Sequence, residues 1–294
     1  MTIRFPWFAL LRVPNLLTVP GDPIAGYLLA AGPAAVIDSR VGLAVLASLC
    51  FYAGGLITND LADVTEDRRD RPARPLPSGL ISGTSARNVA VFLLSLALAL
   101  CAVLGKASLL TGSMLCIGIL GYNLGLKRVV IAGPLVMGCC RSLSLCLGAT
   151  VHGTASVSLV AASGILASYI ALVTWLAQRE MSPSRAGLAG WMPAAILLAG
   201  MAAMVRFTKA PPEEHLRLAG AFFLAFALAA RVAMELRAKT PMPPLIGLLI
   251  SALMPLQSAF CIAAGAGLWS MFFGFVLIAL WPLHRLLSRW FYAS

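Results

Sequence analysis

The few acidic residues of this chain gather in one short polar stretch. The 294 residues include eleven Asp and Glu, and five of them fall between positions 60 and 70. If the preceding apolar helix continues through this stretch, three carboxylates share one face, because helical residues three, four and seven apart lie together. Mutual repulsion is relieved if a divalent cation sits among them, and Mg²⁺ prefers oxygen ligands. The residues on or beside this face are Asn59, Asp60, Asp63 and Asp67.

Arginines follow the acidic residues at once. Guanidinium groups bind phosphate oxygens in pairs, and three are available here: Arg68, Arg71 and Arg74. The alternative is a solvated loop with local ion pairs, such as Asp67 with Arg71. That alternative does not explain why Asp60 and Asp63 lie at the boundary of an apolar segment without adjacent bases. The pattern therefore favours a site for a divalent cation and a diphosphate.

The stretch resembles the first aspartate-rich motif of the UbiA family of membrane prenyltransferases. The family pattern Asn-Asp-x-x-Asp-x-x-x-Asp matches residues 59–67, and Arg-Pro-x-Arg-Pro-Leu-Pro-Ser-Gly at 71–79 continues the match. Two further segments are similar to family elements, Leu-Arg-Val-Pro-Asn at 11–15 and Tyr-Asn-Leu-Gly-Leu-Lys-Arg at 122–128. The resemblance covers residues 10–240 and is strongest in 10–150.

The resemblance implies an all-α integral membrane protein, with a single UbiA-like domain over residues 1–294 and nine to ten transmembrane helices around a central cavity. The implied activity is Mg²⁺-dependent transfer of an isoprenoid from an allylic prenyl diphosphate to a lipid or aromatic acceptor. The implied catalytic residues are Asp60, Asp63 and Asp67, which with Asn59 would hold the metal. The implied diphosphate contacts are Asn59, Arg71, Arg74, Tyr122, Lys127 and Arg128.

The sequence departs from the family pattern at the second aspartate-rich motif, which is expected after the sixth apolar segment. No aspartate occurs beyond position 70, and the acidic residue best placed there is Glu180, a predicted metal ligand. One cation is therefore favoured over two. This departure is similar to a divergent Ebo-type UbiA-like branch. It leaves open a UbiA-like protein without standard prenyl transfer, which binds or moves a lipid or secondary metabolite.

The composition excludes a water-soluble fold. Hydrophobic residues make up 60% of the chain and charged residues 11%, whereas soluble domains have roughly 45–50% and about 25%. The net charge of +11 is attributed to the positive-inside rule and to anionic lipids rather than to nucleic acid. We expect a multi-pass protein of the inner (cytoplasmic) membrane, without nucleic acid or an obligate protein partner.

Apolar segments of spanning length, near 20 residues, supply the expected helices. They fall at 16–37, 41–59, 86–104, 107–125, 130–150, 157–178, 188–206, 217–236, 243–263 and 268–287. The last two are close enough to form one re-entrant pair, so nine or ten spans are expected. Basic residues concentrate in alternate loops, which predicts that both termini and the acidic loop are cytoplasmic. One opposite loop, with Arg206, Lys209 and Arg217 around Glu213 and Glu214, departs from this alternation.

Three polar residues within apolar segments complete the prediction. A carboxylate in a membrane span is costly and usually faces a cavity, so Asp22 is expected either to touch an acceptor or to cap a broken helix. Arg141 is expected at the cavity wall, either contacting the substrate diphosphate or paired with a buried carboxylate. Gln257 is expected to form a helix–helix hydrogen bond. An ion-coupled transporter is a further alternative that rests only on the number of spans.

Overall fold

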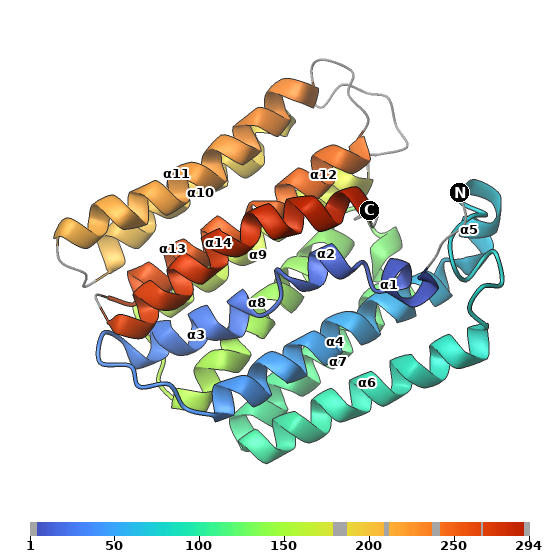
Figure 1. Ribbon diagram of the computed structural model, residues 1–294, viewed down its shortest axis with the longest axis horizontal. Helices are drawn as coiled ribbons and strands as arrows, with labels where there is room; N and C mark the ends of the chain where they lie inside the picture. Colours follow the sequence, from blue (N-terminus) through green and yellow to red (C-terminus); the bar gives the residue numbers. More distant parts are fainter. Residues whose placement is uncertain (1–4, 179–186, 209–211, 237–241, 266, 291–294) are drawn as a thin grey trace.

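The fold is a bundle of long helices that run side by side (Figure 1). The computed structural model describes residues 5–178, 187–208, 212–236, 242–265 and 267–290, and all regular secondary structure in these ranges is helical. The expected all-α class is confirmed.

Nine helical stretches within the described ranges are long and apolar enough to cross a membrane, since about 20 helical residues extend 30 Å. Seven of them lie in a single long helix, one joins the end of the 3₁₀ helix η2 (Gly187–Trp191) to α10, and one contains two α-helices in succession. The helices are α4 (Arg40–Ala62), α6 (Gly83–Leu104), α7 (Lys106–Leu124), α8 (Ala132–His152), α9 (Val157–Gln178), α10 (Met192–Phe207), α11 (Pro212–Glu235), the pair α12 (Met242–Ser251) and α13 (Leu253–Ala263), and α14 (Leu268–Trp290).

The first apolar segment differs from its prediction. Residues 16–37 do not form one spanning helix but contain the end of α2 (Val13–Leu16) and all of α3 (Gly21–Ala31), preceded by α1 (Pro6–Leu10). Eleven residues of α3 extend only about 16 Å. Prolines at positions 14, 20 and 23 remove backbone donors. The last two apolar segments are each long enough to span, so a single re-entrant pair is not what the structure shows.

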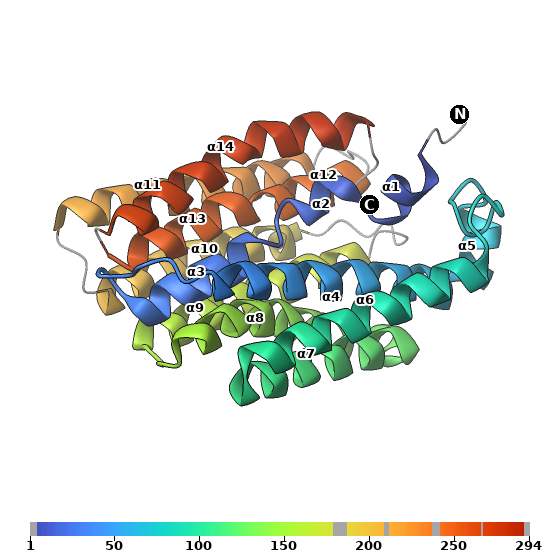
Figure 2. The same ribbon diagram turned by 60° about the horizontal axis from the view of Figure 1, so that its bottom comes forward.

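Close contact between α3 and α8 holds the broken segment inside the bundle. Gly148 of α8 lies against the carbonyl of Pro23, and Gly26 of α3 lies against the carbonyl of Leu145. A side chain at either glycine would collide with backbone, so these residues set the approach of the two helices. Figure 2 shows α6 and α7 along one side of the bundle and α14 along the opposite side, with α3 and α4 between them.

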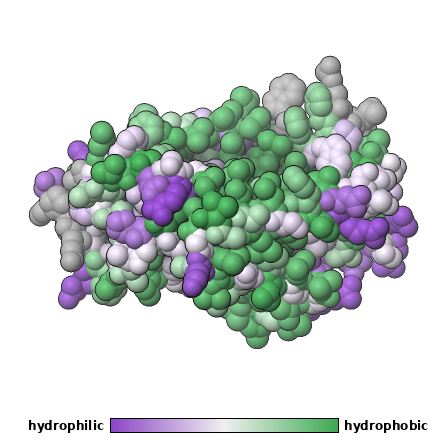
Figure 3. Space-filling model, turned by 90° about the horizontal axis from the view of Figure 1, so that it is seen from below, coloured by the Kyte–Doolittle hydropathy of each residue, from purple (hydrophilic) through white to green (hydrophobic). Residues whose placement is uncertain are grey.

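The connecting segments gather at two ends of the bundle. At one end Gln178, which ends α9, donates to the carbonyl of Lys127 after α7 (3.1 Å). At the other end the Thr208 hydroxyl, after α10, donates to the carbonyl of Ala263 at the end of α13 (2.8 Å). Figure 3 shows a broad hydrophobic band between them, with hydrophilic residues dense at the end that carries α5 (Val64–Asp70). This band is typical of a protein surrounded by lipid.

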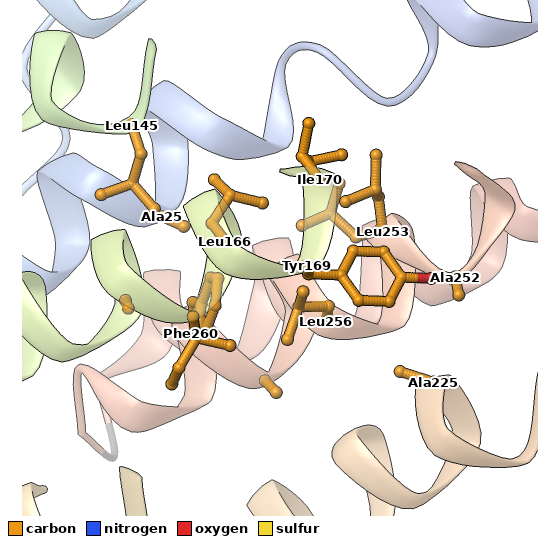
Figure 4. Packing of buried hydrophobic residues seen from close by; sticks show 14 of the residues in the cluster. Ala25, Leu145, Leu166, Tyr169, Ile170, Ala225, Ala252, Leu253, Leu256 and Phe260 are labelled. Carbon is orange, nitrogen blue, oxygen red and sulfur yellow. The ribbon is translucent and has the colours of Figure 1, made fainter. Parts of the chain in front are cut away.

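Buried apolar side chains from α3 through α14 form one continuous cluster. Figure 4 shows its centre, where Tyr169 of α9 lies among aliphatic side chains of α13 and neighbouring residues. The Tyr169 hydroxyl donates to the carbonyl of Leu249 (2.8 Å), so this buried polar atom has a partner. The first helices and the last helices therefore share one core.

Candidate functional site

The acidic stretch keeps a helical path with a break at one residue. α4 ends at residue 62, Asp63 has φ −94° and ψ −1°, and α5 begins at the next residue. Backbone hydrogen bonds four residues apart continue across the break: Asp63 N–H to Asn59 (3.0 Å), Asp67 N–H to Asp63 (2.8 Å) and Arg71 N–H to Asp67 (2.9 Å). The expected common face of the acidic residues is therefore present.

Asp60 pairs with a base from the start of the chain. Arg12 Nη2 lies 3.0 Å from Asp60 Oδ1, and the two side chains are 19% and 7% exposed. Arg12 occupies the left-handed region (φ 47°, ψ 57°) between α1 and α2, a conformation that non-glycine residues rarely adopt. A small apolar cluster that includes Leu10 and Ile57 packs α1 on α4. Arg12 was not among the predicted site residues, although the 11–15 segment had indicated this region.

Asp63 pairs with a base from the segment after α7. Lys127 Nζ lies 2.5 Å from Asp63 Oδ1 and 3.3 Å from Asn59 Oδ1. Asn123, the residue before the last one of α7, donates to the carbonyl of Gly55 (3.2 Å) and fixes this end of α7 against α4. Lys127 and the aspartate motif, predicted from separate parts of the sequence to serve one site, are thus brought together.

Asp67 pairs with Arg74, from the turn that follows α5. Arg74 Nη1 lies 2.7 Å from Asp67 Oδ2, and both side chains are largely buried. The turn that carries Arg74 is fixed by a hydrogen bond from Ser78 N–H to the Arg74 carbonyl (3.0 Å) and by the buried side chain of Leu76. The sequence suggested Arg71 as a local partner of Asp67, whereas the ion pair seen for Asp67 is with Arg74, seven residues further along the chain.

The other predicted site residues lie around these pairs or beyond the described ranges. Tyr122 is half-buried in the last turn of α7, near enough to Asp63 for an electrostatic interaction. Arg128 is exposed in the short 3₁₀ helix η1 (Leu126–Arg128). Glu180, the proposed substitute for a second acidic motif, lies outside the described residues.

The carboxylate and amide oxygens of the motif are the ligands that a hard cation such as Mg²⁺ prefers. In this structure, however, the three carboxylates form ion pairs with basic side chains. Among the described residues, no three Asp, Glu, His or Cys side chains are grouped so that they could hold a metal ion. Three carboxylates and three cationic side chains give this cluster a formal charge near zero. A Mg²⁺–diphosphate complex supplies both a cation for carboxylates and oxygens for the bases. The residues present therefore fit such a complex: the carboxylates would exchange their bases for Mg²⁺, and the bases would exchange the carboxylates for diphosphate oxygens.

A second polar centre lies within the bundle, where the first apolar segment is broken. Asp22 is fully buried; Arg141 Nε lies 2.9 Å from its Oδ2 and Gln257 Nε2 donates to its Oδ1 (2.6 Å). The carbonyl of Thr18 accepts from both Gln257 Nε2 (2.6 Å) and Arg141 Nη2 (2.9 Å). Non-helical backbone at membrane depth needs such partners. The expected helix–helix hydrogen bond of Gln257 is confirmed.

This centre settles how Arg141 is held in the structure. Of the two expectations for Arg141, the ion pair with a buried carboxylate is present, and its guanidinium also lies over the ring of Tyr52, 5.8 Å from the centroid. Tyr52 precedes Asp60 by eight residues on α4, or about 12 Å. The role of Arg141 as a diphosphate contact stays a prediction.

Comparison with known proteins gives a family match and several similar relatives. Residues 23–187 match the model of the UbiA prenyltransferase family. A digeranylgeranylglyceryl phosphate synthase of Metallosphaera sedula is 32% identical over 143 residues, which are 49% of this chain and 50% of that relative. A synthase with the same name from Sulfurisphaera tokodaii is 27% identical over 142 residues, 48% of this chain and 51% of that relative. The chain thus spans about half the length of these relatives.

Solved structures share the fold at low sequence identity. A UbiA homologue from Archaeoglobus fulgidus, bound to GPP and Mg²⁺, superposes with a TM-score of 0.65 and 16% identity, covering 94% of this chain and 100% of the other. An apo UbiA homologue from Aeropyrum pernix K1 gives a TM-score of 0.64 and 17% identity over 83% of this chain and 96% of the other. The helical architecture of the bundle is therefore the one seen in those proteins.

Proposed function

Because the chain belongs to the UbiA prenyltransferase family, we propose that it transfers an isoprenoid from an allylic prenyl diphosphate to a lipid or aromatic acceptor. The observation that carries this proposal is the convergence of three aspartates on one helical path with three bases, two of them from distant segments: Asp60 with Arg12, Asp63 with Lys127, and Asp67 with Arg74. A diphosphate and a divalent cation together satisfy both sets of charges.

In the proposed reaction the bond between the first prenyl carbon and the diphosphate oxygen breaks, and its electron pair leaves with the diphosphate. The acceptor forms a bond to that carbon and loses a proton. Negative charge grows on the leaving oxygens, where Arg12, Lys127 and Arg74 donate charge-assisted hydrogen bonds after they exchange carboxylates for phosphate oxygens. The half-buried position of these side chains strengthens the interaction, because water screens them less.

Mg²⁺, when bound, neutralises charge on the departing diphosphate. The residues proposed to hold it are Asn59, Asp60, Asp63 and Asp67, with Glu180 as a further candidate. Arg71, Tyr122 and Arg128 are proposed as further diphosphate contacts. A single cation is favoured because the sequence has no aspartate beyond position 70. The basic side chains would neutralise the rest of the diphosphate charge.

The proposed setting is the inner (cytoplasmic) membrane, with the acidic end of the bundle and both termini in the cytoplasm, and with residues 1–294 acting as one domain. The nine candidate spans of the described residues support a multi-pass membrane protein. The broken segment of α2 and α3 adds one more crossing, so that α1 and the end of α14 lie at the same end of the bundle as α5 (Figure 1). The single shared core supports one domain. Relatives named for synthesis of digeranylgeranylglyceryl phosphate favour a phosphorylated glycerol lipid among the candidate acceptors.

A second candidate function is a UbiA-like scaffold that binds or moves a lipid or metabolite without turnover. It is favoured by the complete pairing of the three motif aspartates with bases, together with the missing second motif. It predicts binding of a prenyl compound that survives substitution of Asp60 and Asp63 by Asn.

The two functions are separated by turnover in lipid nanodiscs. Purified protein with Mg²⁺ is incubated with allylic diphosphates of several chain lengths and with lipid and aromatic acceptors, and diphosphate release is measured. Prenyl transfer predicts release that Asp60→Asn and Asp63→Asn each abolish. Asp38→Asn is the matched control, because Asp38 pairs with Arg40 at the opposite end of the bundle and should leave release unchanged. No release from any donor and acceptor pair would refute prenyl transfer.

A further inference from the structure

The segment that carries Lys127 is held from two sides. On one side, Lys127 Nζ reaches α4, where it lies 2.5 Å from Asp63 Oδ1. On the other side, the backbone carbonyl of Lys127 accepts a hydrogen bond from Gln178 Nε2 at the end of α9 (3.1 Å). The two partners are 64 and 51 residues away from Lys127 in the chain. Lys127 therefore links the aspartate motif to the end of α9.

The short 3₁₀ helix η1 gives the Lys127 backbone little support of its own. It has only three residues, and hydrogen bonds in such helices have poorer geometry than those in α-helices. The backbone hydrogen bonds that close it accept at the carbonyls of Gly125 and Leu126 (3.0 Å each). The carbonyl of Lys127 is instead bound by the Gln178 amide, from another part of the chain.

Gly133, near the start of α8, allows this contact. A methyl group added there would lie 2.9 Å from Gln178 Nε2 and 3.1 Å from both the Leu126 carbonyl oxygen and Lys127 Cα. These distances are shorter than the 3.5–4.0 Å or so of a favourable contact between non-bonded atoms. Gly133 is buried, so an added side chain could not turn away into open space. Glycine at this position therefore lets α8, η1 and the end of α9 meet.

The hold on the backbone matters because of the chemistry of lysine. Its amine is a point charge at the end of a flexible chain, so the place of the amine depends on where the backbone is fixed. A backbone already in place leaves less conformational entropy to lose when the amine exchanges Asp63 for a diphosphate oxygen. The end of α9 precedes the position where the second aspartate-rich motif is missing. A hydrogen bond to the Lys127 segment gives this end of α9 another way to serve the site.

We propose that Gln178 is a positioning residue for Lys127. Its amide holds the Lys127 carbonyl, and this hold keeps the Lys127 amine beside the aspartate motif. Gln178 acts through Lys127 and is assigned no contact with the substrate. The consequence for diphosphate binding rests on the proposed function, whereas the placement of the amine in the ligand-free protein does not.

The first test measures the accessibility of the Lys127 amine in the ligand-free protein. Protein in lipid nanodiscs is acetylated with an N-hydroxysuccinimide ester, and mass spectrometry compares Lys127 with Lys106, an exposed lysine at the other end of α7. Lys127 is 12% exposed and paired with Asp63, so it should react slowly. Gln178→Met keeps the approximate length of the side chain without a donor. It should raise Lys127 labelling roughly fivefold relative to Lys106, the effect of losing one neutral hydrogen bond.

Matched variants separate positioning from general loosening of the bundle. Gly133→Ala should displace the Gln178 amide and raise Lys127 labelling as well, whereas Gly164→Ala, whose methyl group meets nothing within 4 Å, should not. Ser158→Ala removes a hydrogen bond of the same kind, from a side chain to a backbone carbonyl (3.1 Å), at the other end of α9, and should also leave labelling unchanged. Unchanged labelling in Gln178→Met, or an equal increase in the controls, would overturn the proposal whether or not the protein transfers prenyl groups.

A double-mutant cycle tests the consequence for diphosphate binding. The probe is a non-hydrolysable geranyl diphosphate analogue with Mg²⁺, and its affinity is measured by isothermal titration calorimetry in nanodiscs. Gln178→Met should weaken binding roughly fivefold and should have no further effect once Lys127→Met has removed the amine. An equal effect in both backgrounds, or no binding to the unsubstituted protein, would contradict the role in diphosphate binding. Binding without turnover would refute the proposed prenyl transfer and leave the positioning role of Gln178 intact.

Discussion

Breaking the buried ion pair of Asp22 and Arg141 should destabilise the whole bundle. Arg141→Met removes the cation 2.9 Å from Asp22 Oδ2 and one of the two donors to the Thr18 carbonyl. Asp22 is fully buried, so its carboxylate would keep only neutral partners. Removing one member of a buried pair costs about 3–5 kcal/mol. At roughly 2–4 °C per kcal/mol, the melting temperature should fall by about 6–20 °C.

A double-mutant cycle identifies the cause. Asp22→Asn together with Arg141→Met leaves no charge in this buried centre, and the double variant should be more stable than the sum of the single changes predicts, by about 1–3 kcal/mol. The assay is thermal unfolding in detergent micelles or nanodiscs without ligand. Arg231→Met is the control, because Arg231 and Glu235 form an exposed pair on α11, worth less than about 1 kcal/mol. Additive effects, or a loss in Arg141→Met no larger than in the control, would refute this reasoning.

Three further predictions concern the motif and the packing. Arg12→Gln removes the partner of Asp60 and should raise KM for the prenyl diphosphate at least tenfold with a smaller change in KM for the acceptor; equal changes in both would contradict a diphosphate role. Chelation with EDTA should stop diphosphate release in nanodiscs and added Mg²⁺ should restore it, whereas release that persists in EDTA would contradict metal dependence. Gly148→Val places a side chain against the carbonyl of Pro23 and should lower the unfolding free energy by about 1–3 kcal/mol, the usual effect of overpacking, so an unchanged melting temperature would show that α3 and α8 separate easily.

Helix positions were largely predictable, because spanning length and apolarity are local properties of the sequence. The segment expected at 157–178 is α9, with the same bounds, and the other long helices begin or end within a few residues of their predictions. The first segment was predicted only in part: it runs from the α5 end of the bundle to the opposite end (Figure 1), but as α2 and α3 rather than as one helix. Its mean hydropathy suggests a span, but Pro20 and Pro23 interrupt the backbone hydrogen bonds, and Arg141 and Gln257 then serve the freed Thr18 carbonyl. Those partners are more than 100 residues away.

The candidate site was predictable in part for a similar reason. The spacing of Asp60, Asp63 and Asp67 alone indicates a common helical face. The bases that pair with Asp60 and Asp63 are 48 and 64 residues away in the chain. A local sequence pattern does not predict contacts between residues that far apart. Lys127 was reached only through the family resemblance, and Arg12 was missed as a site residue. The Ebo-type assignment and the number of metal ions stay predictions.

The most direct test of the account is an experimental structure with Mg²⁺ and a non-hydrolysable prenyl diphosphate analogue. The account predicts the diphosphate within hydrogen-bond distance of Arg12 and Lys127, and Lys127 no longer 2.5 Å from Asp63, whose carboxylate binds the metal instead. A diphosphate bound elsewhere, or bound while the three aspartate–base pairs stay intact, would contradict it.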